Sequence, residues 1–321
     1  MKPTFFTLTF ALVFLFSGFK AIAHKDSSLI NRPAQLSFIP PLSTNGLQSA
    51  KVINNLSLNL FAGYQGGLNG LELGGFANVI RYDMKGAQFA GFGNTVFGNS
   101  LGGQFGGFYN INLGYTKGAQ FSGFINAVVD SIDAFQAAGF TNVTTKGGSG
   151  AQVAGFNNLS IGHFNGAQIA GFMNTTIGDL SGPQIGGFTN VAIGNVKGLQ
   201  LSGFANVATG NVSGSQISGF INTAKRVKGS QIGFINIADT VDGAAIGFLS
   251  LVKKGYHKLE IEANETFYAL ASAKLGTQKF YNIFSFGFRP TNNHAYWVYG
   301  YGVGTQIPLS QKLNINFDLE S

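Results

Sequence analysis

The chain has 321 residues, of which 47 are Gly and 32 are Phe, none is Cys, and only 10% are charged, with a formal net charge of +7. Soluble globular proteins contain roughly 25% charged residues and about 7% Gly, so this composition excludes an ordinary soluble enzyme. The 45% hydrophobic content excludes a disordered chain, and the lack of Cys excludes disulfides, thiolate metal sites and cysteine nucleophiles. We therefore expect an envelope-bound β-protein.

A secretory signal peptide is predicted at residues 1–23. Lys2 precedes an apolar run from Phe5 to Phe16, and the small-x-small pattern Ala21-Ile22-Ala23 follows this run. The run is shorter than the roughly 20 apolar residues that span a bilayer, which argues against a transmembrane helix. Cleavage after Ala23 would remove Lys2 and Lys20 and lower the net charge from +7 to +5.

A sixteen-residue repeat dominates residues 56–250, after an expected N-terminal leader or linker at 24–55. The Gly-Phe dipeptide recurs at nine successive intervals of 16 residues from Phe76 to Phe220, and two intervals of 14 follow it to Phe248. The unit reads G-x-Q-(apolar)-(small)-G-F-x-N-(apolar). Most units carry three or more Gly, and each Gly costs about 1 kcal/mol in a helix interior, so the repeats cannot be helical.

The fixed period predicts a β-solenoid of about twelve 16- or 14-residue coils, because stacking would place each position about 4.8 Å from its counterpart. We expect Phe to form an apolar column, Gln and Asn to form hydrogen-bonded amide ladders, and the small residue before Gly-Phe to make room for the ring. An all-antiparallel meander or barrel is the alternative, against which the equal intervals count. The candidate ladder residues are Phe92, Phe108, Phe124, Phe156, Phe172, Phe188, Phe204, Gln88, Gln104, Gln168, Gln200, Asn94, Asn110, Asn174 and Asn206.

These tandem units resemble the glycine-rich surface-repeat family of envelope proteins from leptospires and Bacteroidetes. The resemblance covers about residues 63–250 and rests on the motif G-x-Q-x-(x)-G-F-x-N. It implies an exported repeat protein of the outer surface, and it supplies no catalytic residues.

Residues 251–321 lose the period and are predicted to form antiparallel strands like those of an outer-membrane barrel. Tyr281 to Arg289, Ala295 to Thr305 and Lys312 to Glu320 alternate apolar and polar residues, and about four such strands fit after Leu259. They could be an incomplete barrel, a barrel completed by strands such as Leu56 to Gly63, or a soluble sheet that caps the repeats. The expected membrane-facing residues are Phe284, Phe286, Phe288, Trp297, Tyr299 and Tyr301.

The sequence offers little for catalysis or metal binding. Asp130 and Asp133 are a close acidic pair before the end of the repeats, and we interpret them as solvated connector residues rather than a glycosidase pair. The histidines are widely spaced and form no zinc motif, and the basic residues are scattered rather than clustered as nucleic acid would require. We expect no catalytic residues, no metal, no cofactor and no nucleic-acid partner.

The leading hypothesis is a non-enzymatic, exported protein of the outer membrane or cell surface of a Gram-negative bacterium. Its role would be structural or adhesive, with outer-membrane lipid and an envelope or extracellular protein or glycan as partners. A transport or pore-forming barrel, with the Gly-Phe repeats as barrel strands, is the alternative. A polysaccharide-degrading β-helix enzyme is a third reading, based on fold analogy alone.

Overall fold

A computed structural model describes residues 29–263, 268–290, 294–310 and 313–321. The fold is all-β, with a β-solenoid of about 12 turns followed along the chain by a curled, antiparallel, five-stranded sheet. The predicted fold class is thereby confirmed. The predicted signal peptide at residues 1–23 lies outside the described residues.

Two compact units divide the chain, one ending at Gly178 and the other running from Asp179 to Ser321. This division falls within the repeats, whereas the sequence pattern changes near residue 250. The strands up to Gly178 are β1(Ile30–Ile39), β2(Leu42–Ser43), β3(Val52–Asn59), β4(Ala62–Gln65), β5(Gly67–Gly74), β6(Ala77–Ile80), β7(Met84–Ala90), β8(Gly93–Val96), β9(Ser100–Gly106), β10(Tyr109–Asn112), β11(Thr116–Ser122), β12(Ile125–Val128), β13(Ile132–Ala138), β14(Thr141–Thr144), β15(Gly148–Ala154), β16(Asn157–Ile161), β17(Phe164–Ala170) and β18(Met173–Ile177).

The second unit contains the remaining repeats and the C-terminal sheet. Its strands are β19(Leu180–Ser181), β20(Gln184–Gly186), β21(Thr189–Ile193), β22(Val196–Lys197), β23(Gln200–Ser202), β24(Ala205–Ala208), β25(Asn211–Val212), β26(Gln216–Ser218), β27(Ile221–Val227), β28(Gln231–Ile232), β29(Ile235–Val241), β30(Ala245–Ile246), β31(Leu249–Val252), β32(Tyr256–Glu262), β33(Ala269–Thr277), β34(Phe280–Pro290), β35(Ala295–Pro308) and β36(Asn314–Glu320).

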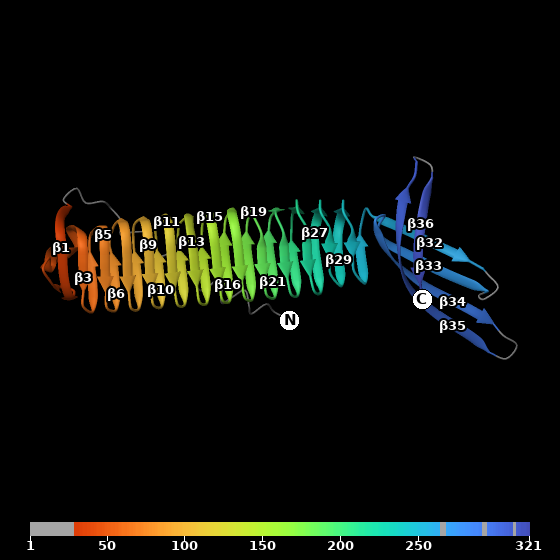
Figure 1. Cartoon of the computed structure of the whole chain (residues 1–321), viewed down its shortest axis with the longest axis horizontal. Helices are drawn as coiled ribbons and strands as arrows, with labels where there is room; N and C mark the ends of the chain where they lie inside the picture. Colours follow the sequence, from red (N-terminus) through yellow and green to blue (C-terminus); the bar gives the residue numbers. More distant parts are fainter. Residues whose placement is uncertain (1–28, 264–267, 291–293, 311–312) are drawn as a thin grey trace. The chain divides into compact units, whose positions relative to one another are not determined.

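Within each unit the repeats pair in parallel and in register with the coil one period away. Gln104 lies beside Gln120 between β9 and β11, and Asn110 lies beside Asn126 between β10 and β12. Figure 1 shows these strands side by side in successive coils. The antiparallel alternative is therefore wrong for the repeats, and the equal sixteen-residue spacing follows from one coil per period.

Glycine allows this close stacking where backbones meet at the corners. A Cβ placed on Gly107 would lie 1.9 Å from the carbonyl oxygen of Gly91, and one on Gly91 would lie 2.2 Å from that of Gly75. Real Cβ atoms do not approach an oxygen so closely, so the Gly of each Gly-Phe pair is required by sterics.

Residues 30–55, expected to be leader or linker, are part of the folded structure. Strand β1 pairs in parallel with β3, with Ile30 beside Val52, and the short 3-10 helix η1(Gly46–Lys51) connects β2 to β3. These elements cover the first coil of the repeats.

The C-terminal strands β32 to β36 form one antiparallel sheet with neighbours in chain order. About four strands were expected, and five are present because the sheet begins at Tyr256. The sheet covers the last coil of its own unit: the Asn282 side chain accepts a hydrogen bond from the Ser250 N–H (3.1 Å) and donates one to the Gly247 carbonyl (2.6 Å). The sequence left three possibilities for these strands: an incomplete barrel, a barrel completed by other strands, or a sheet that caps the repeats. The contact with the last coil is the feature expected of a cap.

Candidate functional surface

The interior of the solenoid is polar, because the Gln column points inward. Gln88, Gln104, Gln168 and Gln200 are all fully buried. Along the ladder a Gln donates its side-chain N–H to the Oε1 of the Gln one coil earlier, as Gln104 does to Gln88 at 3.1 Å and Gln200 to Gln184 at 2.9 Å. Buried amides are tolerated here because the stack satisfies them.

The Asn column forms a second buried ladder that runs in the opposite direction. The Nδ2 of Asn94 donates to Asn110 at 2.9 Å, and that of Asn206 donates to Asn222 at 3.0 Å, in each case toward the following coil. Asn174 accepts in the same way from Asn158 at 2.9 Å. Each amide also reaches a backbone carbonyl, for example Asn94 with Phe105 at 3.0 Å. The two ladders therefore align their amide dipoles in opposite directions.

The Phe column lies on the outside of the solenoid. Rings of successive coils stack nearly parallel, with centroids 5.1 Å apart for Phe92 and Phe108 and 4.8 Å apart for Phe188 and Phe204. The candidate rings other than Phe172, which is partly buried, are 37–42% exposed: Phe92, Phe108, Phe124, Phe156, Phe188 and Phe204. Because each ring covers the face of the next, the column presents ring edges to solvent.

The small residue before Gly-Phe was expected to make room for the ring, but it does not. It is buried next to the Asn ladder, where a Cβ on Gly74 would lie 2.2 Å from Oδ1 of Asn78 and one on Gly186 would lie 2.7 Å from Oδ1 of Asn190. The strand ends at this residue, and the bend at the Gly-Phe pair that follows turns the ring to the outside. Its small size therefore accommodates the Asn amide.

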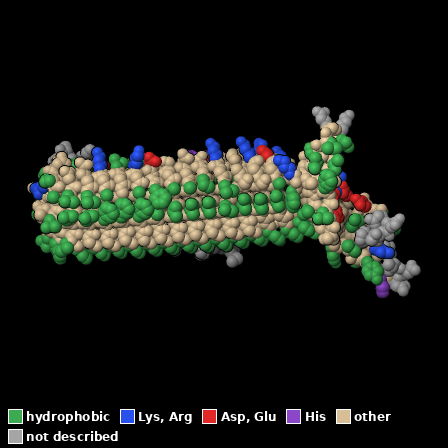
Figure 2. Space-filling view, viewed as in Figure 1, with side chains coloured by type: hydrophobic (Ala, Val, Ile, Leu, Met, Phe, Trp, Pro, Cys, Tyr) green, Lys and Arg blue, Asp and Glu red, His purple; other side chains and the backbone are tan. Residues whose placement is uncertain are grey.

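A second apolar row, not selected from the sequence, follows the residue after each Gln. Leu73, Phe89, Phe121 and Ile169 are each about 40% exposed on this row. The apolar position after Gln in the repeat unit could have identified this row from the sequence. Hydrophobic side chains form continuous rows along the coils, and charged side chains gather along one edge (Figure 2).

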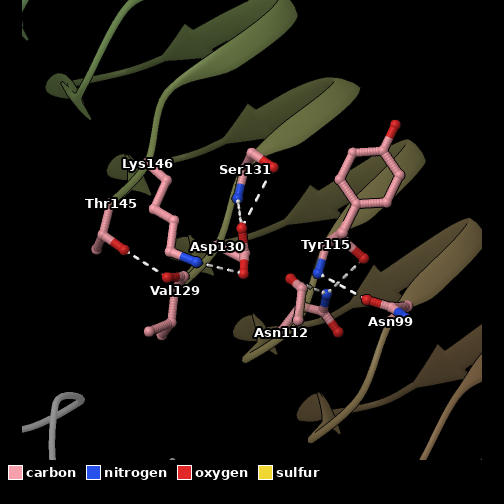
Figure 3. A network of polar contacts seen from close by, with 9 residues as sticks. Asn99, Asn112, Tyr115, Val129, Asp130, Ser131, Thr145 and Lys146 are labelled. Atoms are coloured by element: carbon pink, nitrogen blue, oxygen red, sulfur yellow. Dashed lines mark hydrogen bonds and ion pairs between the residues drawn. The ribbon is translucent and has the colours of Figure 1, made fainter.

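The charged edge is a set of pairs between neighbouring coils. Asp130 lies 2.6 Å from the Lys146 ammonium, and Asp133 lies 3.5 Å from that of Lys117. Figure 3 shows Asp130 accepting from Lys146 and from the backbone of Ser131. Burial opposes the charge of Asp130, but the Lys146 and Ser131 hydrogen bonds outweigh it and hold the pKa below its ordinary value. The two carboxylates are therefore engaged in separate surface ion pairs.

Glu72 is a buried acid within the Gln ladder. It occupies the position sixteen residues before Gln88 and is fully buried. Its Oε1 accepts from Asn59 at 2.8 Å and its Oε2 accepts from Gln88 at 2.8 Å, so two donors converge on it. Burial raises its pKa from 4.5 to about 7, against the opposing effect of the Gln88 and Asn59 hydrogen bonds. The sixteen-residue register could have identified this residue from the sequence.

We predict that Glu72 makes the folded state less stable as the pH rises. The folded protein binds the Glu72 proton more tightly than the unfolded chain, so stability falls between about pH 4.5 and pH 7. The shift corresponds to a loss of roughly 3 kcal/mol. Chemical denaturation at several pH values should show that Glu72→Gln removes this slope. Asp133→Asn, the same acid-to-amide change at an exposed site, should retain it, and an equal effect of both variants would contradict the prediction.

The C-terminal sheet has one apolar and one polar face. Of the expected membrane-facing residues, Phe286, Trp297 and Tyr299 are exposed, with Tyr299 80% exposed, and Phe288 is partly buried beside Trp297. The other two contact the last coil instead: Phe284 and Tyr301 both pack on Phe248, with ring centroids 5.9 Å and 5.0 Å away. These two rings therefore make contacts within the protein.

A charged cluster lies on the polar face of this sheet and was not predicted. The ammonium of Lys274, whose side chain is 4% exposed, lies 2.6 Å from Glu260 and 2.7 Å from Asp318. Tyr281 also donates to Asp318, and Ser285 donates to Glu320. These groups come from four strands, and both the pairing and the curl of the sheet bring them together.

Within the described ranges, no group of three or more His, Cys, Asp or Glu residues could hold a metal ion. The same residues contain no helix long and apolar enough to cross a membrane. Comparison with known proteins finds no matching family model, no matching curated protein and no matching solved structure. The resemblance to the surface-repeat family therefore stays a prediction.

Proposed function

We propose that this chain is a non-enzymatic, exported repeat protein of the cell envelope with a structural or adhesive role. In this proposal the C-terminal sheet attaches the protein to outer-membrane lipid, and the repeats contact an envelope or extracellular partner. The observation that carries the proposal is the two-faced sheet, on which Leu259, Ile261 and Leu319 are more than 70% exposed while Lys274 and its carboxylate partners occupy the other face. Strands that face lipid alternate in this way.

The fold gives no support to the pore alternative, in which the repeats are barrel strands. The repeats pair in parallel between coils, and their interior is filled by stacked amides. A glycan-degrading role gains no support either, because Asp130 and Asp133 are held by separate lysines.

Membrane attachment can be tested by fractionation of a Gram-negative host that expresses the full chain. We expect the protein to remain with outer membranes after high-salt and carbonate washes. The double variant Ile261→Asp and Leu319→Asp should reduce the retained fraction roughly tenfold, because charge on a lipid-facing strand is costly. A control double variant, Leu47→Asp and Leu60→Asp, changes leucines outside the sheet that are 91% and 71% exposed, and it should be retained. Release of the unmodified protein would contradict attachment.

A further inference from the structure

A long apolar groove runs along the outside of the first unit. It measures about 1150 Å³, and it extends from Leu36 to Gly155. One wall is the row that follows the Gln column, and the floor is formed by the small residue and the Gly that come next in each coil. The wall residues are Leu58, Leu73, Phe89, Phe105, Phe121 and Val153. The stacked Phe column begins directly after the floor glycines and borders the groove.

The groove is uncharged, and its surroundings limit what can bind there. None of the described residues that line it is charged. The charged groups of these coils, such as Lys117, Asp130 and Lys146, form pairs at the separate edge described above. An extended apolar surface of this size is uncommon on a monomeric protein and marks an interaction site.

The exposed apolar area matches what a protein dimer requires. The rings of the bordering column are 37–41% exposed, which for an aromatic side chain means roughly 80 Å² each. Six such rings and the four wall residues of similar exposure, Leu58, Leu73, Phe89 and Phe121, provide roughly 800 Å² on one copy. This is the area that each partner contributes to a stable interface of ordinary size. The rings are Phe76, Phe92, Phe108, Phe124, Phe140 and Phe156.

Ring geometry argues against a glycan in this groove. Sugars would need exposed ring faces and hydrogen-bonding side chains. Here the ring faces cover one another, with interplanar angles of 1° between Phe92 and Phe108 and 2° between Phe140 and Phe156. A lipid surface is also disfavoured, because interfacial protein segments place Lys and Arg beside their apolar face, whereas the positions that border this groove are uncharged.

We propose that the groove binds the same groove of a second copy of this chain. The wall row of each copy would lie over the glycine floor of the other, which is the self-complementary arrangement of a two-fold interface. A second copy also has the same spacing between coils, so apolar side chains can meet at every coil. This inference does not depend on export or on membrane attachment.

The test is the oligomeric state of the full mature chain, measured by analytical ultracentrifugation in a mild non-ionic detergent over a range of micromolar concentrations. We expect a dimer. Phe121→Glu, a change in the groove wall, should raise the dissociation constant roughly 30-fold or more, as a central interface residue does. Leu101→Glu is the matched control, because Leu101 is 37% exposed, close to the 39% of Phe121, but does not line the groove.

Three outcomes would overturn the proposal. The first is a monomer at every concentration. The second is equal weakening by Phe121→Glu and Leu101→Glu, which would place the interface elsewhere. The third is a monomer that binds phosphatidylethanolamine vesicles through Phe121, which would assign the groove to lipid. Circular dichroism of each variant would verify that the fold is retained. None of these outcomes bears on attachment through β32 to β36, which uses a different surface.

Discussion

Replacing Asn126 with alanine is expected to lower the free energy of unfolding by about 3–5 kcal/mol, because unsatisfied buried polar groups cost about 1–3 kcal/mol each. Asn126 is fully buried and accepts from Asn110 at 2.9 Å. It also donates to Asn142 at 2.9 Å and to the Ala137 carbonyl at 2.8 Å. Its removal interrupts the ladder in the middle: the Asn142 Oδ1 loses its ladder donor, and the Asn110 Nδ2 loses its ladder acceptor and keeps only backbone carbonyls.

The matched control is Asn99→Ala. Asn99 is exposed, and its side chain accepts a single hydrogen bond from the backbone of Tyr115 at 3.0 Å. We expect this change to cost less than about 1 kcal/mol, as is usual for surface positions. Denaturant unfolding of the two variants gives the comparison. Equal losses would mean that the Asn ladder contributes no more than a surface hydrogen bond.

Replacing Gly107 with alanine should destabilise the solenoid by more than about 4 kcal/mol or prevent folding, since a steric conflict with the backbone of the neighbouring coil has few ways to relax. The added Cβ would lie 1.9 Å from the Gly91 carbonyl oxygen. That conflict involves backbone on both sides, so the two coils must separate. Their separation would lengthen the hydrogen bond from the Gly107 N–H to the Ala90 carbonyl, now 3.0 Å.

Gly103→Ala, on the same strand as the following Gln104, provides the control for Gly107→Ala. Its register neighbours one coil away are Ala87 and Ala119, so this column already accommodates Cβ atoms. The nearest atom to the new Cβ belongs to the Phe105 ring, which can move. We expect a change within about 1 kcal/mol. Thermal unfolding followed by circular dichroism would distinguish the two variants, and similar melting temperatures would refute the steric argument.

The sixteen-residue register is enough to assign Glu72 to the Gln ladder. Glu72 belongs to no acidic motif in the sequence. Counting back sixteen residues from Gln88 places it in the amide ladder, and the structure shows it buried between Asn59 and Gln88. Its raised pKa, however, depends on full burial, which the sequence does not state.

The amino-acid sequence by itself determined the solenoid and its period. Equal intervals between Gly-Phe pairs favour one coil per repeat, and identical residues in register predict the Gln and Asn ladders, because amides stacked one coil apart can donate to and accept from one another. It also determined that strands follow residue 250, since apolar and polar residues alternate there.

Only the tertiary structure decided which columns are inside. Phe and Gln recur with the same period, so periodicity cannot tell which of them is buried. The structure buries Gln and Asn and leaves Phe exposed, because the coil interior is narrow and the stacked amides satisfy their hydrogen bonds there. In the C-terminal sheet, strand pairing likewise places Lys274 beside Glu260 of the neighbouring strand, and the curl of the sheet brings it to Asp318, three strands away. Alternation within one strand carries no information about which strands become neighbours or how the sheet curls.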